Sequence, residues 1–378
     1  MSVQAVPGGP TIDQLAGLVR GAIAPRLETP GDVSRLVEEA AQHGMTGLLA
    51  YRAGGGGAAW PDELRAALRN EIARGVALDA IRQRETTAVL ADLAKRGVRP
   101  LLLKGIALAY TLYDNPALRP RFDADVLVRR EDMDAVGEVM IARGYARPRQ
   151  VTGELVMDQL DYTRKDAHGV WHVYDFHWKL ANRLAVADML SYDELADGAV
   201  AIPALGPHAR GLGRVHALML ACVHRVAHHP ADERLIWIHD IHLLSGSMSR
   251  EEARALASLA VDRGVSAVCA DGLAAAQRWF GTVLPEGLLD ALTARPRGEP
   301  EASAVFLRPD GSRAEELLSD LRALPDWPTR LRLLYEHAFP SPAYMSGMYM
   351  VSNRALLPAL YAHRICRGAW KWFRRAPR

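Results

Sequence analysis

The sequence predicts an α+β fold, in which a small mixed β-sheet is flanked by an N-terminal and a C-terminal helical region. Apolar residues recur with helical spacing in the first quarter of the chain, short strand-like runs alternate with helical ones over 98–178, and only helical patterns follow Asp193. A chain of 378 residues has room for two or three domains. We expect them at 1–97, 98–200 and 201–378.

Three helices are expected in the N-terminal region. The first spans 11–24, where Thr11 is a suitable N-cap and the apolar residues that follow share one face. The second spans 32–43 and is closed by Gly44. A long third helix covers 61–97. Nothing in this region indicates chemistry, so it reads as a helical scaffold.

The central region opens with a short buried strand over 98–103, which stops at Lys104 and Gly105 and leads into a helical run over 106–113. A strand-to-helix corner with glycine at the bend presents backbone N–H groups and the positive end of a helix. Lys104 adds a positive charge there. It could merely brace the corner, but its position favours phosphate binding.

Asp123 and Asp125 lie two residues apart and run into a short apolar segment. If this segment is a strand, both carboxylates point to one face. Two like charges about 4 Å apart repel by roughly 4 kcal/mol at an effective dielectric near 20, so a compensating cation is expected. Mg²⁺ is the leading candidate and Mn²⁺ the alternative. The other interpretation is a solvated strand edge or turn.

Two arginines, Arg119 and Arg121, precede the carboxylate pair. A guanidinium group suits phosphate because it donates two parallel hydrogen bonds. The same residues could instead brace the loop, and the sequence leaves both interpretations open.

A β-hairpin is expected next, with strands over 160–165 and 170–178 and Gly169 in the turn. Asp175 lies between two aromatic residues on the second strand, so its charge needs a partner in the sheet. That partner is either the metal site or one of the two arginines before the carboxylate pair. His177 shares the face of Asp175, as a hydrogen-bonding neighbour of the site or as a structural histidine.

Two segments carry a resemblance to a known family: LLLKG over 101–105 and RPRFDADVLV over 119–128. They resemble the bacterial nucleotidyltransferase-like family of the DNA polymerase β superfold, whose members carry a Lys-Gly corner and an R-x-x-x-D-h-D-h-h-V strand. The similarity extends to 234–241 and 339–341. The wider superfold usually has Gly-Ser or Gly-Gly at the phosphate corner, where this chain has Lys-Gly.

The resemblance implies a Mg²⁺-dependent enzyme that transfers a nucleotidyl or phosphoryl group from a nucleoside triphosphate to a hydroxyl. In this comparison Asp175 matches the third carboxylate of the superfold, which often acts as base on the incoming hydroxyl. The implied site residues are Asp123, Asp125 and Asp175 for metal binding and catalysis, Lys104, Gly105, Arg119 and Arg121 for the nucleotide, and His177 and Asp240 as substrate contacts or supporting residues. A peptide and an RNA are both open as acceptor.

The C-terminal region is expected to be helical, and the resemblance implies that it closes one side of the substrate cleft. The helical runs are 213–229, 233–244, 250–263, 267–280, 287–294, 314–324 and 328–338. The last segment, 353–378, is basic and aromatic. It could contact RNA, a membrane surface or an acidic peptide, or it could dock on the body with a solvated basic face.

A second cluster offers an alternative function. His224 and His228 are four residues apart on one helix face, and with Asp240 they could bind a transition metal, as in metal phosphohydrolases. The full order of ligands of the HD-type phosphohydrolases is absent. A further alternative is a non-catalytic nucleotide-binding scaffold, against which the repulsion among three carboxylates argues.

Composition constrains the setting. The formal net charge is +2, which argues against a large RNA footprint. Cys222, Cys269 and Cys366 are widely spaced and are expected to be buried thiols in a reducing compartment. We see neither a signal peptide nor a run long enough to span a bilayer, so a cytoplasmic protein is expected. The abundance of Ala, Arg, Gly and Pro suggests a bacterial source.

Overall fold

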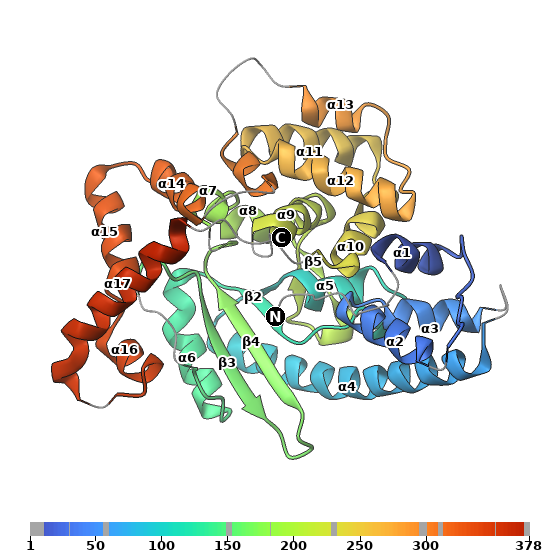
Figure 1. Cartoon of the computed structure of the whole chain (residues 1–378), viewed down its shortest axis with the longest axis horizontal. Helices are drawn as coiled ribbons and strands as arrows, with labels where there is room; N and C mark the ends of the chain where they lie inside the picture. The colour runs from blue at the N-terminus through green and yellow to red at the C-terminus, as the bar shows by residue number, and fades with distance from the viewer. Residues whose placement is uncertain are drawn as a thin grey trace.

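A computed structural model describes residues 11–29, 31–55, 60–148, 153–181, 183–227, 233–294, 301–308, 313–351 and 353–373. A mixed sheet lies in the middle of the molecule, and helices from both ends of the chain surround it (Figure 1). This is the α+β arrangement that the sequence predicts. None of the helices within the described ranges has both the length and the apolar character needed to cross a membrane.

Four helices form the N-terminal region: α1 (Ile12–Arg20), α2 (Asp32–Gln42), α3 (Thr46–Gly54) and α4 (Asp62–Lys95). Thr11 caps α1 as predicted, because its side chain accepts a hydrogen bond from the backbone N–H of Gln14 and the Gln14 side chain accepts one in return. α1 ends earlier than predicted because Gly21 turns into the left-handed region, with φ 70°. Helix α3 was not predicted, since so short a helix shows little periodicity.

The sheet has six strands in the order β3-β4-β2-β1-β6-β5. They are β1 (Leu101–Leu102), β2 (Ala124–Leu127), β3 (Gln159–Lys165), β4 (Trp171–His177), β5 (Val200–Ala201) and β6 (Arg210–Gly211). The prediction that strands cease after Asp193 is wrong, because β5 and β6 extend the sheet beyond β1. Strands of two residues are too short to produce an alternating pattern in the sequence.

The register of the sheet separates an apolar face from an acidic one. Val126 of β2 pairs with Phe176 of β4, and both pack against α4 and against α6 (Met133–Ala142). Asp125 pairs with Asp175 one position earlier on the same two strands. Because successive side chains point to opposite faces, these two carboxylates lie on the face away from α4 and α6.

The remaining helices are α5 (Lys104–Thr111), α7 (Leu184–Ala187), α8 (Tyr192–Asp197), α9 (Arg214–Ala227), α10 (Leu235–Gly246), α11 (Arg250–Asp262), α12 (Ser266–Phe280), α13 (Leu288–Thr293), α14 (Arg313–Ala323), α15 (Trp327–Ala338), α16 (Pro342–Met348) and α17 (Leu357–Phe373). The predicted C-terminal helices therefore form. Helices α9, α10 and α12 pack side by side, and α14–α17 form a separate group at the other end of the molecule (Figure 1).

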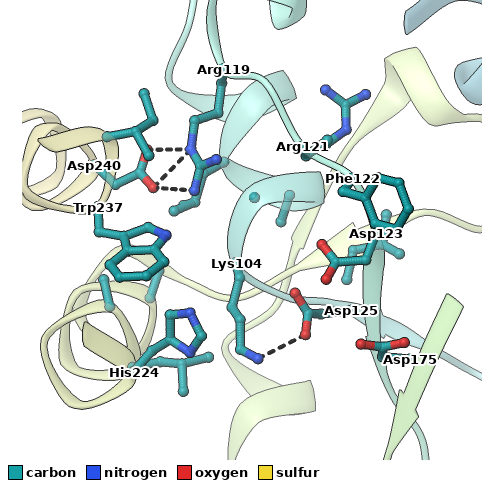
Figure 2. A pocket seen from close by; sticks show the side chains of 18 of the residues that line it. Lys104, Arg119, Arg121, Phe122, Asp123, Asp125, Asp175, His224, Trp237 and Asp240 are labelled. Atoms are coloured by element: carbon teal, nitrogen blue, oxygen red, sulfur yellow. Dashed lines mark hydrogen bonds and ion pairs between the residues drawn. The ribbon is translucent and has the colours of Figure 1, made fainter. Parts of the chain in front are cut away.

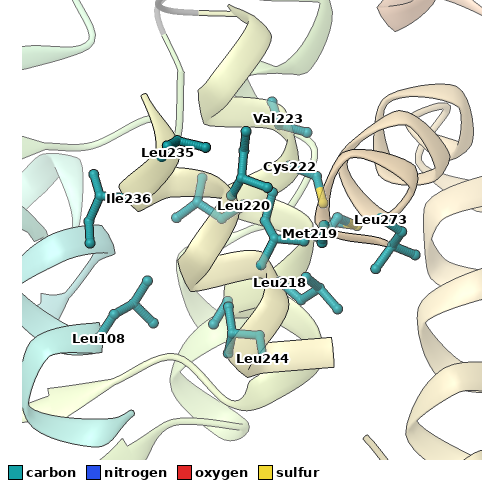
Figure 3. Packing of buried hydrophobic residues seen from close by; sticks show 14 of the residues in the cluster. Leu108, Leu218, Met219, Leu220, Cys222, Val223, Leu235, Ile236, Leu244 and Leu273 are labelled. Carbon is teal, nitrogen blue, oxygen red and sulfur yellow. The ribbon is translucent and has the colours of Figure 1, made fainter. Parts of the chain in front are cut away.

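One buried cluster joins the C-terminal helices to the corner helix α5. Leu108 of α5, Leu220 of α9 and Ile236 of α10 all belong to it (Figure 3). The position of α5 is thus set by the packing of α9 and α10.

The three cysteines are free thiols. Two of them, Cys222 and Cys269, are buried, as expected, but Cys366 is exposed on α17. The expectation of burial is wrong there because the side of α17 that carries Cys366 faces solvent.

Candidate active site

A cavity of about 1090 Å³ opens over the acidic face of the sheet, at the upper end of the usual size of ligand pockets. Side chains from β2, β4, α5, α9 and α10 line it (Figure 2), and Tyr344 of α16 lines it as well. The predicted site residues among them are Lys104, Gly105, Arg119, Arg121, Asp123, Asp125, Asp175 and Asp240. The remaining predicted residue, His177, is buried and contacts Asp125.

The three predicted carboxylates share one wall of this cavity. The parallel pairing of β2 and β4 sets Asp125 opposite Asp175, and Asp123 lies just before β2 (Figure 2). Carboxylate oxygens of Asp125 and Asp175 and a ring nitrogen of His177 lie within 4.8 Å of one another. Among the residues that the structure describes, this is the one such group of three His, Cys, Asp or Glu side chains. Asp123 lies outside this closest group.

Asp125 is held by two donors. Nζ of Lys104 lies 2.7 Å from its Oδ1, and Nε2 of His177 lies 2.9 Å from the same oxygen. Burial acts to raise the pKa of Asp125, but the ammonium of Lys104 and the hydrogen bond from His177 hold it well below its usual range. Burial acts against the charge of Lys104, yet Asp125 raises the pKa of the amine. Both groups are therefore charged at neutral pH.

Asp175 is in the opposite situation. Burial, together with repulsion from Asp161, Asp125 and Asp123, raises the pKa of Asp175 to about 8. Asp161 adds its charge because it pairs with Asp175 across the β3–β4 hairpin. Asp123 is accessible from the cavity, but desolvation by the surrounding walls and the charge of Asp125 raise its pKa as well. The wall thus carries more negative charge than the single ammonium of Lys104 balances.

The strand-to-helix corner at Lys104 and Gly105 has an unexpected backbone conformation. Lys104, and not Gly105, is in the left-handed region, with φ 49°. An L-residue there costs about 1–2 kcal/mol, and the bond to Asp125 helps to hold it in place. At Gly105 a Cβ atom would lie 3.4 Å from the guanidinium of Arg119, an ordinary van der Waals contact, so the Arg119 side chain lies close to the first turn of α5.

Arg119 forms a buried ion pair with Asp240 of α10. Its Nε and Nη2 lie 2.9 and 2.8 Å from Oδ2 of Asp240, and Nη1 donates to the carbonyl of Pro120 (Figure 2). The hydroxyl of Tyr113 also donates to Asp240, at 2.7 Å. Burial lowers the pKa of His239 to about 3, so this ring is neutral beside Tyr113. The network ties the corner of α5 to α10.

Arg121 is engaged elsewhere, with Asp79 of α4 and, at 3.0 Å, with the hydroxyl of Tyr110. Neither arginine pairs with Asp175, so the structural ion pair left open by the sequence is not what the structure contains at the described residues. Asp175 faces the cavity without an ion-pair partner among them.

The structure describes two of the three residues of the alternative histidine cluster, His224 and Asp240. His224 lines the cavity beside Trp237, with ring centroids 5.5 Å apart. His228 lies outside the described residues. Asp240 is occupied by Arg119 and Tyr113 and belongs to no metal-ligand group among the described residues.

Three residues of this site were missed by reasoning from the sequence. Asp161 faces Asp175 only through the hairpin register, which a count back from Gly169 could have revealed. Trp237 lies three residues before the predicted Asp240 in the sequence, but its position in the cavity depends on the orientation of α10. Tyr344 of α16 has no local signal at all.

The acidic face of the sheet and the strand-to-helix corner with Lys104 line the same cavity. Residues 29–281 match a family described as "Uncharacterised nucleotidyltransferase", and the chain belongs to this family. The enzyme class predicted from the sequence is therefore confirmed, and a nucleoside triphosphate is the substrate that this class uses. No match was found among curated proteins.

The residues present fit a divalent cation. Carboxylate oxygens are the donors that Mg²⁺ and Mn²⁺ take, and besides burial, the negative charge of the neighbouring carboxylates raises the pKa of Asp175. The second ring nitrogen of His177, Nδ1, is buried without a hydrogen-bond partner, so this ring orients Asp125 through Nε2 alone.

Proposed function

We propose that this protein is a Mg²⁺-dependent nucleotidyltransferase whose active site is the carboxylate wall of β2 and β4. The observation that carries the proposal is the pairing of Asp125 with Asp175 across parallel strands, next to the ammonium of Lys104. Asp123, Asp125 and Asp175 would hold the cation, which would neutralise the triphosphate and align the attacking and leaving oxygens. Mn²⁺ could substitute for Mg²⁺.

The corner would receive the phosphates. Lys104 provides a charge at the start of α5, where free backbone N–H groups favour an anion. Since Asp240 and Asp79 already hold Arg119 and Arg121, these arginines would contribute mainly through the N–H groups that remain on the cavity side.

Asp175 would take the proton of the acceptor hydroxyl. Its carboxylate lines the cavity and pairs with Asp125 across the two strands, and a carboxylate near the metal can accept the proton of a hydroxyl nucleophile. The acceptor oxygen bonds to the α-phosphorus, the bond from that phosphorus to the β-phosphate oxygen breaks, and pyrophosphate leaves. If the γ-phosphorus were attacked instead, phosphate would be transferred and a nucleoside diphosphate released.

Calorimetric titration of ATP, GTP, CTP and UTP tests the proposal, with and without Mg²⁺. We expect Mg²⁺-dependent binding of at least one nucleotide, weakened at least about tenfold in Asp123→Asn/Asp125→Asn. The matched control is Asp193→Asn, an exposed carboxylate that pairs with Arg129 away from the cavity. The control should bind as the wild type does.

Two results would redirect the interpretation. If no nucleotide binds the wild type with Mg²⁺ or Mn²⁺, the non-catalytic scaffold without a nucleotide site replaces the transferase. If His224→Ala removes Mg²⁺-dependent activity while Asp123→Ala does not, the metal site belongs to the helical half, as in a metal phosphohydrolase.

A further inference from the structure

The last helices of the chain reach the cavity although they lie beyond the family match, which ends at residue 281. Tyr344 of α16 lines the same cavity as the carboxylates of β2 and β4. Helices α14–α17 form the group at one end of the molecule in Figure 1. A ligand in the cavity therefore has this group beside it.

A specific contact fixes the group to the cavity wall. The carboxylate of Glu336 on α15 accepts hydrogen bonds from the backbone N–H groups of Leu155, at 2.8 Å, and Val156, at 3.2 Å. Val156 itself lines the cavity. A Cβ atom on Gly153 would lie only 2.5 Å from this carboxylate, so a larger residue there would displace the Glu336 side chain.

Charge is distributed very unevenly between this end and the rest of the chain. Residues 337–378 contain seven Lys and Arg and no Asp or Glu. Because the whole chain has a net charge of +2, the first 336 residues carry five more acidic than basic side chains. The near-neutral net charge of the whole chain, which argued against a large RNA footprint, is therefore the sum of a basic end, residues 337–378, and an acidic remainder.

Within the described residues, Arg364 of this end lies beside a residue that lines the cavity. The guanidinium of Arg364 on α17 lies 5.8 Å from the ring centroid of Tyr344. Arg354 and Arg367, before and after it, are exposed to solvent. A polyanion bound along α17 would be led past Tyr344 to the carboxylate wall.

The helix α15 carries three exposed apolar side chains, two of which are aromatic. Trp327, Leu331 and Tyr335 recur every four residues along α15 and are 70%, 60% and 63% exposed. Arg330 lies over the Trp327 ring, at 5.3 Å from its centroid. Flat exposed rings next to arginines are the surface on which unpaired bases stack, at about 1–3 kcal/mol for each base.

We propose that α15–α17 bind single-stranded RNA and direct its hydroxyl end into the cavity as the acceptor. This inference rests on the proposed function. RNA combines the three features required: a polyanionic backbone for the basic end, bases for the aromatic stripe and a terminal hydroxyl for transfer. An acidic peptide lacks the bases, and a membrane surface offers no flexible end to enter the cavity.

The transfer step balances with no further reactant. A terminal ribose hydroxyl oxygen forms the bond to the α-phosphorus of the nucleotide, its proton passes to the carboxylate of Asp175, and pyrophosphate leaves. The RNA grows by one nucleotide.

Fluorescence anisotropy of a labelled single-stranded RNA of about 20 nucleotides tests the surface, with the full chain and no nucleotide. We expect Arg354→Glu/Arg367→Glu to weaken binding at least about tenfold and to flatten its dependence on salt. Trp327→Ala/Tyr335→Ala should weaken binding with little change in that dependence. The control Arg74→Glu/Arg278→Glu reverses two arginines that are 72% and 68% exposed elsewhere, and should alter binding less than threefold, roughly.

Further measurements distinguish RNA binding at α15–α17 from the alternative ligands and from a failure of the transferase activity. Asp123→Asn/Asp125→Asn should keep RNA binding, so a failed transferase assay leaves the surface tested on its own. The proposal is overturned if the charge-reversal variant and its control bind RNA equally. It is also overturned if polyglutamate, a DNA of the same sequence or vesicles rich in phosphatidylglycerol bind more tightly than the RNA.

Discussion

Asp125 organises the site at the level of single residues. It receives Lys104 and His177 on one oxygen, so the carboxylate that pairs with Asp175 is already fixed and ionised. Asp175 has no such donors among the described residues. Burial and repulsion from the neighbouring carboxylates therefore raise its pKa. Two aspartates on neighbouring strands thus differ in protonation because of what lies beside each of them.

This difference predicts that Asp175→Asn stabilises the metal-free protein while it abolishes transfer. The pKa of Asp175 rises from 3.8 to about 8 on folding, so the folded chain holds more protons than the unfolded chain between these values, and stability falls as pH rises through that window. The asparagine side chain does not titrate, so this loss of stability with rising pH is absent from Asp175→Asn. We expect a gain in the free energy of unfolding of about 1–3 kcal/mol at pH 8.5, discounted for the open cavity, and less at pH 5.

Urea denaturation at a series of pH values, with a chelator present, measures this gain. Asp193→Asn serves as control, because its exposed carboxylate should give a difference that does not grow with pH. A gain from Asp175→Asn that is absent at pH 8.5, or that shrinks as pH rises, contradicts the assignment.

At the scale of elements, the start of α5 has an unfavourable left-handed backbone conformation at Lys104. Its φ of 49° suits glycine, whereas alanine would keep the strain. We therefore expect Lys104→Gly to be more stable than Lys104→Ala by about 1 kcal/mol, although both lose the ammonium. Thermal unfolding compares the two variants.

The reverse order is expected at an ordinary position in a helix interior, Arg254 of α11, which is exposed. There Gly should be less stable than Ala by about 0.8–1 kcal/mol. Equal stability of the two Lys104 variants would mean that the left-handed backbone at the corner is not retained in solution.

Helix α10 is joined to the corner through the buried pair of Arg119 and Asp240. Asp240→Asn leaves a buried guanidinium without its counter-charge, so we expect a loss of about 3–5 kcal/mol in the free energy of unfolding. Arg119→Met/Asp240→Leu, which removes both charges, should restore most of this loss. If Asp240→Asn costs less than about 1 kcal/mol by urea denaturation, the pair does not hold α10 on the corner.

The elements also show where sequence patterns suffice. The hairpin of β3 and β4 and the N-cap of α1 at Thr11 follow from local chemistry, and both were predicted. Strands β5 and β6 were missed because they exist only through pairing with β1 and each other. The strained residue at the corner was assigned to Gly105, since glycine is the usual choice, but the bond to Asp125 allows Lys104 to take it.

At the scale of the whole molecule, the attachment of the C-terminal helices depends on Glu336. Glu336→Ala removes the acceptor for two backbone N–H groups, so we expect faster hydrogen exchange at Leu155 and Val156, together with a loss of about 1–3 kcal/mol in the free energy of unfolding. Exchange in α9 and α10, which pack in a different part of the core, should not change. Unchanged exchange at Leu155 and Val156 would contradict the attachment.

The sequence by itself determined the class of enzyme to which this protein belongs. The Lys-Gly corner and the spacing of Asp123 and Asp125 are local patterns, and the resemblance that they carry to a nucleotidyltransferase family predicted this class. Only the tertiary structure decided the partners: Asp240 for Arg119, Asp79 for Arg121, and Tyr344 at the cavity. These contacts join residues far apart in the chain, and their choice depends on packing of whole helices, which no local pattern encodes.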